Sequence, residues 1–201
     1  DADREMACLT DRELGEYFIV DANGGLSVET ALRFLRLLPS HADIVLEAPC
    51  ATWREHMSLR KRTSIPMVWD ELATSDAAIA QLISDDGAEG VGLKISKNGG
   101  LTPCRRQRYM CIAAGYSLSV QDTVGSDIAF AAIAHLGQTI PAHLLRCILD
   151  TRDMVSITTA DATHKGGFDR RDGWVTAPSS PGLGIDPRMD VLGEPVMSFS
   201  L

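Results

Sequence analysis

The chain has 201 residues and a formal net charge of −8, with 45% hydrophobic and 23% charged residues, which is ordinary for a globular protein. The acidic balance speaks against a nucleic-acid partner, because neutralising phosphates takes a basic surface. No apolar run approaches the ~18 residues of a membrane helix, and the five cysteines form no CxxC pair, so we expect a cytoplasmic protein with reduced thiols and no membrane partner.

Short apolar segments alternate with amphipathic segments along most of the chain. The predicted strands are Tyr17–Val20, Ile44–Leu46, Met67–Trp69, Gly92–Ile95, Ser117–Val120 and Arg146–Leu149. The predicted helices are Val28–Leu38, Trp53–Arg62, Ser75–Ser84, Pro103–Ala114 and Ser126–Thr139. Ser75 and Ser126 suit helix N-caps, and Gly115 suits a helix C-terminus. Strands that alternate with helices at this spacing indicate βαβ units and a parallel sheet.

The two ends of the chain depart from this alternation. Residues 1–14 read as a helix without a starting methionine, and after residue 154 the sequence becomes polar and rich in turn residues. A closed eight-stranded barrel takes roughly 250 residues. We therefore expect a piece of a longer protein, with barrel units over residues 1–154. Residues 155–201 would form an extended C-terminal segment that packs against another part.

An ionisable residue lies at the end of the apolar run of each of the first four predicted strands. Asp21, Glu47, Asp70 and Lys94 recur at intervals of 26, 23 and 24 residues, about one strand and one helix with their loops. The same ends of successive parallel strands meet at one mouth of a β/α barrel, so these side chains would converge there. Clustered carboxylates repel one another unless a cation lies among them, and oxygen ligands favour Mg²⁺, with Mn²⁺ as the alternative. The pattern predicts an enzyme with a metal site and a lysine base.

Each of these residues also has a purely structural explanation. Asp21 precedes Ala-Asn-Gly-Gly and can shape a turn by accepting a hydrogen bond from its own backbone. Glu47 and Asp70 can start loops or cap helices. Lys94 lies among apolar neighbours, where it is either a general base with a pKa lowered by Mg²⁺ or a lysine that pairs with a carboxylate at the strand end. Lys97 falls in the following loop, where it positions the site or contacts solvent.

Other catalytic signatures find no support in the sequence. The Gly-x-Gly formed by Gly90 and Gly92 has Ile95 where a dinucleotide fingerprint needs glycine, and there is no Walker lysine-serine pair. The five histidines show no metal-ligand spacing. A Gly-x-Ser-x-Gly elbow for Ser-His-Asp hydrolysis is absent as well.

Several short strings surround the strand-end residues. They are Val-Asp21-Ala-Asn23-Gly-Gly, Leu-Glu47-Ala-Pro49, Trp-Asp70-Glu71, Leu-Lys94-Ile-Ser-Lys97-Asn-Gly-Gly and, in the tail, Pro181-Gly182-Leu183-Gly184. Their combination resembles the enolase superfamily, in its mandelate racemase and muconate lactonizing branches. The resemblance implies a modified (β/α) barrel whose third, fourth and fifth strands each end in a Mg²⁺ ligand and whose sixth ends in a lysine acid/base. By position, Asp21, Glu47 and Asp70 are then the ligands and Lys94 is the catalytic residue. Glu71 competes with Asp70 as the third ligand.

A second group of strings is longer. It comprises Leu-Glu-Ala-Pro-Cys50-Ala-Thr-Trp-Arg54-Glu, Asp-Glu-Leu-Ala-Thr, Gly-Ser126-Asp127-Ile-Ala-Phe and Arg152-Asp153-Met. These strings resemble the cis-3-hydroxy-L-proline dehydratases of the superfamily. The resemblance implies a Mg²⁺-dependent hydro-lyase of amino-acid catabolism that removes the α-proton, eliminates water and gives 1-pyrroline-2-carboxylate. That subgroup uses a second lysine after the second strand and an N-terminal capping domain, so both would precede residue 1, and a homo-oligomer is expected.

Related reactions use the same residues, so alternatives stay open. They are a racemase or epimerase of proline betaine or amino acids, a muconate-type cycloisomerase, and a non-catalytic fragment. The enzymes among them all remove a proton next to a carboxylate that Mg²⁺ holds. Contacts to a small amino or imino acid substrate are predicted for Asp150, Asp122, Glu71 and Asn23. Asp150 is preferred as the acceptor for a secondary ammonium, although a loop-capping role fits it equally well.

Overall fold

The computed structural model describes residues 17–39, 42–122, 126–150, 170–171 and 173–198. The helix predicted over residues 1–14 and the turn signals between residues 151 and 169 lie outside these ranges. Among the described helices, none combines the length and the apolar character that crossing a lipid bilayer requires.

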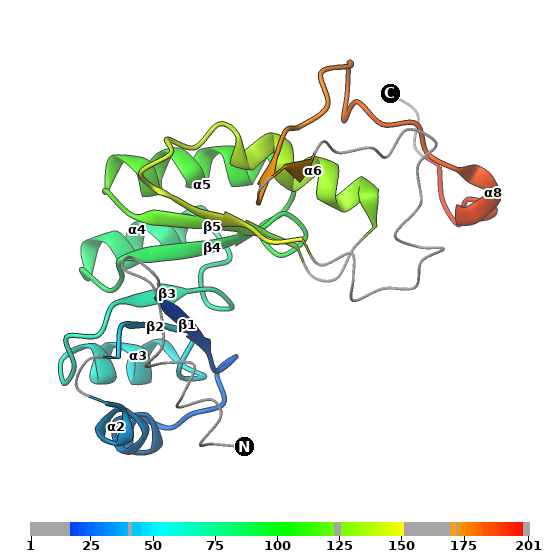
Figure 1. Cartoon of the computed structure of the whole chain (residues 1–201). Helices are drawn as coiled ribbons and strands as arrows, with labels where there is room; N and C mark the ends of the chain where they lie inside the picture. The colour runs from blue at the N-terminus through cyan, green and yellow to red at the C-terminus, as the bar shows by residue number, and fades with distance from the viewer. Residues whose placement is uncertain (1–16, 40–41, 123–125, 151–169, 172, 199–201) are drawn as a thin grey trace. The chain divides into compact units, whose positions relative to one another are not determined.

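The main sheet has six strands whose order in space follows their order in the sequence (Figure 1). The strands are β1 (Phe18–Asp21), β2 (Ile44–Glu47), β3 (Met67–Trp69), β4 (Gly90–Lys94), β5 (Ser117–Gln121) and β6 (Leu145–Ile148). The helices between them are α2 (Val28–Leu37), α3 (Trp53–Arg60), α4 (Asp76–Ser84), α5 (Leu101–Ala113) and α6 (Asp127–Gly137). The strand pairs β1–β2, β2–β3, β3–β4 and β5–β6 are parallel. The predicted class, α/β with the successive β/α units of a partial TIM-type barrel, is confirmed, with element ends within about two residues of the prediction.

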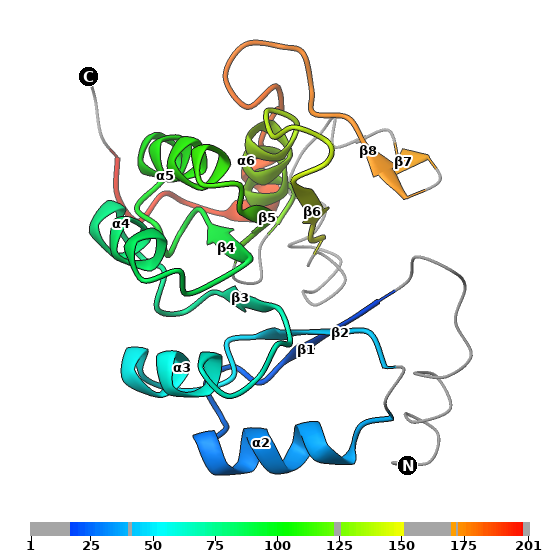
Figure 2. The same ribbon diagram turned by 90° about the vertical axis from the view of Figure 1, so that its left-hand side faces the viewer.

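The first compact unit, Asp1–Val91, contains β1 to β3 with α2 to α4. All residues of β2 and β3 are buried, as expected for central strands of a parallel sheet. Helices α2 and α3 lie side by side (Figure 2). The side chain of Ser75 accepts a hydrogen bond from the N–H of Ala78, which confirms Ser75 as the N-cap of α4.

The second compact unit, Gly92–Leu201, contains β5, β6, α5 and α6. Both α5 and α6 contact β5, and α6 also contacts β6 (Figure 2). Ser126 caps α6 by accepting a hydrogen bond from the N–H of Ile128. At the end of α5, Gly115 has a φ of +77° and the N–H of Tyr116 donates to the carbonyl of Cys111 at 2.9 Å. This Schellman arrangement confirms Gly115 as the helix stop.

The C-terminal segment contains two short strands and one short helix in its described part. Strands β7 (Arg170–Arg171) and β8 (Trp174–Val175) form an antiparallel pair, and α8 (Met189–Leu192) is a short helix that was not predicted. Nε2 of His135 on α6 lies 3.1 Å from the carbonyl oxygen of Leu183, so part of this segment packs within its own unit. The predicted domain boundary after residue 154 falls outside the described residues and stays a prediction.

Candidate active site

Three carboxylates follow consecutive parallel strands of the first unit. Asp21 ends β1 and Glu47 ends β2, and the two residues are direct partners in the register of the pair. Asp70 comes directly after β3. Asp21 is exposed, whereas Glu47 is 7% and Asp70 only 1% exposed. The fold thus places the predicted ligands at the carboxyl ends of neighbouring strands.

Main-chain hydrogen bonds join the loops that follow β1 and β2. The N–H of Gly24 donates to the carbonyl of Ala48 at 2.7 Å, and the N–H of Leu26 donates to that of Pro49 at 3.0 Å. Gly24 has a φ of +73°, and a Cβ there would lie 3.3 Å from the Cα of Ala51. Glycine is needed at this position both for its left-handed backbone and for the close approach of the two loops.

Asp21 has a hydrogen-bonding role in its own turn. Its Oδ1 accepts a hydrogen bond from the N–H of Asn23 at 2.9 Å, which is the turn-shaping role that the sequence allowed. Asn23 has a φ of +46°, a left-handed conformation that asparagine adopts more readily than most residues. A carboxylate has about four lone-pair sites, so this bond is compatible with metal ligation by Asp21.

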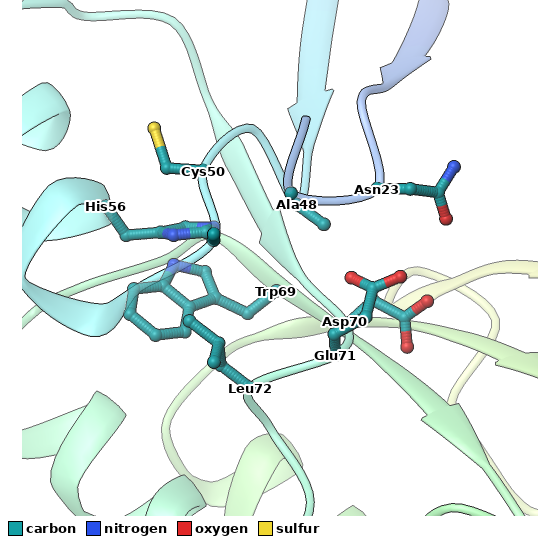
Figure 3. Close-up of a pocket in the computed structure, with 10 residues that line it drawn as sticks. Asn23, Ala48, Cys50, His56, Trp69, Asp70, Glu71 and Leu72 are labelled. Carbon is teal, nitrogen blue, oxygen red and sulfur yellow. The ribbon is translucent and has the colours of Figure 1, made fainter. Parts of the chain in front are cut away.

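A cavity of about 210 Å³ lies beside these strand ends (Figure 3). Its lining includes Asn23, Cys50, His56, Trp69, Asp70 and Glu71. In Figure 3, the carboxylates of Asp70 and Glu71 extend on one side of the cavity, away from Cys50 and His56. Three residues predicted to bind metal or substrate therefore line one cavity, namely Asn23, Asp70 and Glu71. Cys50 and Trp69 stand in the strings quoted around Glu47 and Asp70 but were not assigned to the site, and His56 was not singled out for it either.

The donor set suits a hard divalent cation. Three carboxylates at neighbouring strand ends offer only oxygen ligands, which Mg²⁺ prefers. Within the described part of the chain, no three His, Cys, Asp or Glu side chains lie close enough together to form a metal site. The structure thus gives the order of the three carboxylates along the sheet and the burial of Glu47 and Asp70.

His56 forms the buried wall of the cavity together with Trp69. The ring centroids are 4.4 Å apart, and His56 is 1% exposed. Burial lowers the pKa of His56, and the contact of its Nδ1 with the carbonyl of Thr52, at 3.2 Å, opposes that shift only in part. His56 is therefore neutral at pH 7, with Nδ1 as the donor to Thr52.

We expect His56 to make the protein less stable in mild acid. Its pKa is lower in the folded than in the unfolded state, so below about pH 6.5 the unfolded state binds more protons. The stabilisation is complete above that pH and is lost as the pH falls through it. Urea unfolding between pH 8 and pH 5 should show a shallower loss in His56→Phe than in the wild type. The exposed His143, replaced by Gln, is the matched control, and equal slopes in all three proteins would contradict the assignment.

Lys94 is the last residue of β4 and belongs to the second unit, where it is half-buried. Its main-chain N–H donates to Oδ1 of Asn98 at 3.1 Å, and its carbonyl accepts from the N–H of Asn98 at 2.8 Å. Nζ of Lys97 donates to the carbonyl of Gly92 at 3.1 Å, so Lys97 ties the following loop to β4.

The remaining predicted contacts also follow strands of the second unit. Asp122 comes directly after β5 and accepts a hydrogen bond from the hydroxyl of Ser96. Asp150 lies two residues after the end of β6. Both are half-buried. Their roles toward a substrate stay predictions.

Comparison with known proteins gives a consistent picture. A family model described as enolase C-terminal domain-like matches residues 2–191. The cis-3-hydroxy-L-proline dehydratase of Roseibium aggregatum is 36% identical over 200 residues, which are 100% of this chain and 53% of that enzyme. A less similar relative, the D-Ala-D/L-Ala epimerase of Cytophaga hutchinsonii, is 28% identical over 86% of this chain and 46% of its own length. The chain spans about half the length of these curated relatives.

Solved structures show the same fold. One from Aspergillus oryzae, described as a mandelate racemase/muconate lactonizing enzyme, matches with a TM-score of 0.91 and 62% identity, over 99% of this chain and 54% of that one. Another of the same description, from Roseovarius nubinhibens ISM and complexed with magnesium, has a TM-score of 0.91 and 54% identity, over 100% of this chain and 54% of that one.

Proposed function

Because this chain belongs to the enolase superfamily, through its C-terminal domain-like family, we propose that it is part of a Mg²⁺-dependent dehydratase of cis-3-hydroxy-L-proline. The observation that carries the proposal is the 36% identity to a dehydratase of this substrate along the whole chain. Carboxylates at three consecutive strand ends and a lysine at the end of the next strand support it. The product would be 1-pyrroline-2-carboxylate.

In this proposal Asp21, Glu47 and Asp70 hold the metal ion. We assign the third position to Asp70 rather than Glu71 because Asp70 follows β3 directly and is buried, whereas Glu71 is exposed. When bound, Mg²⁺ would stabilise the negative charge that develops on the substrate carboxylate as the α-proton leaves. The related structure complexed with magnesium supports the choice of metal.

Lys94 is the proposed acid/base of the elimination. The Cα–H bond breaks, its electron pair forms the Cα–Cβ double bond, and the hydroxyl leaves from Cβ as water after it receives a proton. The resulting enamine then tautomerises to the cyclic imine. In the cis isomer the hydroxyl and the α-hydrogen lie on opposite faces of the ring, so an anti elimination needs one group on each face. Lys94 is assigned one of these two proton transfers.

The substrate ammonium is assigned to a carboxylate at the end of a later strand. We retain Asp150 as the preferred acceptor and Asp122, which accepts a hydrogen bond from Ser96, as the second. A charge-assisted hydrogen bond of this kind is stronger than a neutral one. Asn23 and Glu71 line the cavity next to Asp70 and complete the set of proposed contacts.

An amino-acid epimerase is the second candidate, favoured by the similarity to the D-Ala-D/L-Ala epimerase. Product analysis separates the two. Protein expressed from its complete reading frame, incubated with Mg²⁺ and cis-3-hydroxy-L-proline in D₂O, should consume the substrate and yield the imine by NMR. The trans-3 isomer is the matched control, because its hydroxyl and α-hydrogen share a face, and it should react far more slowly. Exchange and inversion at Cα without imine would reject the dehydratase in favour of an epimerase.

A further inference from the structure

The side chain and backbone of Asn98 hold both main-chain polar groups of Lys94. Oδ1 of Asn98 accepts the hydrogen bond of the Lys94 N–H at 3.1 Å, and the N–H of Asn98 donates to the Lys94 carbonyl at 2.8 Å. These two groups flank the Cα from which the lysine side chain starts. Holding both of them fixes the direction of the Cα–Cβ bond at the end of β4.

The amide of Asn98 is itself oriented by a second buried amide. Its Nδ2 donates to Oε1 of Gln107 on α5 at 2.7 Å. Asn98 is 3% and Gln107 is 1% exposed, so water does not compete for this bond. Because the nitrogen of Asn98 is engaged by Gln107, the oxygen is the atom presented to Lys94. Gln107 thus acts on Lys94 without touching it.

The turn between β4 and α5 allows Gln107 on α5 to reach Asn98. Gly99 and Gly100 have φ values of +90° and +102°, and the N–H of Gly100 donates to the carbonyl of Ile95 at 2.8 Å. Sγ of Cys104 lies 3.9 Å from the Lys94 carbonyl. Burial raises the pKa of Cys104 to about 11, so the thiol stays protonated at neutral pH and can donate a hydrogen bond to this carbonyl. The first turn of α5 therefore contacts the backbone of Lys94 directly, through Cys104.

We propose that Asn98 and Gln107 are positioning residues that hold Lys94 in place for proton transfer. This inference rests on the proposed role of Lys94 as an acid/base. Proton transfer requires donor and acceptor atoms within about 2.6–3.2 Å of each other. A misplacement of about 1 Å can cost ~10²-fold in rate, so a lysine that reacts benefits from a fixed starting point.

The test compares Asn98→Leu and Gln107→Met with the wild type, using protein from the complete reading frame, Mg²⁺ and cis-3-hydroxy-L-proline. We expect kcat per folded molecule to fall about 10–100-fold in each variant, with KM within about threefold. The primary isotope effect on kcat with α-deuterated substrate should change in both variants: it rises if Lys94 takes the α-proton and falls if Lys94 protonates the leaving hydroxyl. A purely structural role would change neither quantity once the signal is normalised to folded protein.

Cys111→Ala is the matched control. Cys111 is buried one helical turn beyond Gln107 on α5, so its truncation weakens the same helix. Cys111→Ala should leave both kcat per folded molecule and the isotope effect unchanged. Should Asn98→Leu not fold, Asn98→Ser takes its place in the same comparison.

The outcomes separate this inference from the proposed function. If Lys94→Ala is inactive while both amide variants keep the wild-type kcat and isotope effect, the positioning role is wrong and the function stands. Near-normal turnover by Lys94→Ala would remove the proposed role of Lys94 and the positioning role with it, whereas a wild type that does not dehydrate the substrate would reject the proposed function. Loss of kcat with a changed isotope effect in both amide variants, but not in Cys111→Ala, supports the inference.

Discussion

Replacing Lys94 with alanine should lower kcat for dehydration of cis-3-hydroxy-L-proline by ~10²–10⁴-fold or more, the range typical for loss of a general acid or base. Lys94 is assigned one of the two proton transfers of the elimination, and the alanine side chain can neither take nor give that proton. Affinity for Mg²⁺ should stay near the wild-type value, because the assigned ligands are Asp21, Glu47 and Asp70. Steady-state kinetics and titration calorimetry measure the two quantities.

Lys61→Ala is a suitable control for this prediction. Lys61 is an exposed residue at the C-cap of α3, so its replacement removes the same charge from a surface helix end. It should leave kcat unchanged. Near-normal turnover by Lys94→Ala would exclude Lys94 as a catalytic acid or base, whereas equal losses in both lysine variants would point to a general effect of charge.

The double variant Asp21→Asn, Glu47→Gln should lose most of its affinity for Mg²⁺. Loss of a partner outside the coordination sphere commonly costs ~10–100-fold in metal affinity, so loss of two ligands should cost at least that much. Asparagine at position 21 keeps the Oδ1 that accepts from Asn23, so the turn after β1 should persist. Glutamine conserves the volume of the buried Glu47. Calorimetry with Mg²⁺ alone gives the affinity, and circular dichroism checks the fold.

Two further replacements complete this experiment. Asp70→Asn should weaken Mg²⁺ binding more than Glu71→Gln, and the opposite order would move the third ligand to Glu71. Asp86→Asn serves as the control, because Asp86 is exposed with a φ of +50°, which asparagine readily adopts. Unchanged affinity in the double variant would reject Asp21 and Glu47 as ligands.

The regular part of the fold could be predicted from the sequence because each element has its own local signal. Apolar runs of strand length alternate with helical periodicity, and capping residues mark the helix ends. The start of β4 was placed two residues too late, at Gly92 instead of Gly90. In the structure Gly90 pairs with Val68 and Val91 with Trp69, through backbone bonds that need no side chain. Helix α8 has only four residues, too few to show a period.

The strand-end residues of the candidate site could be predicted from the sequence, but the lining of its cavity could not. The position of each strand-end residue follows from the alternation of strands and helices, so Asp21, Glu47, Asp70 and Lys94 could be singled out. The lining of the cavity by His56 depends on how α3 packs on β3, which no local pattern encodes. The bond between Asn98 and Gln107 likewise forms only because the Gly99–Gly100 turn folds α5 back toward the end of β4.

The hydrogen bonds between the loops after β1 and β2 restrict how this protein could acquire a different reaction. Gly24 bonds to Ala48 and Leu26 to Pro49, so a substitution that displaces one loop displaces the other. The strand ends that carry Asp21 and Glu47 are therefore structurally coupled. We expect selection to conserve both or to lose both. With Asp122 and Asp150 proposed as the acceptors for the substrate ammonium, we expect new substrates to be gained more readily by varying the ends of β5 and β6. A mutant library for altered specificity should begin at Asp122 and Asp150 and leave residues 21–26 and 47–50 untouched.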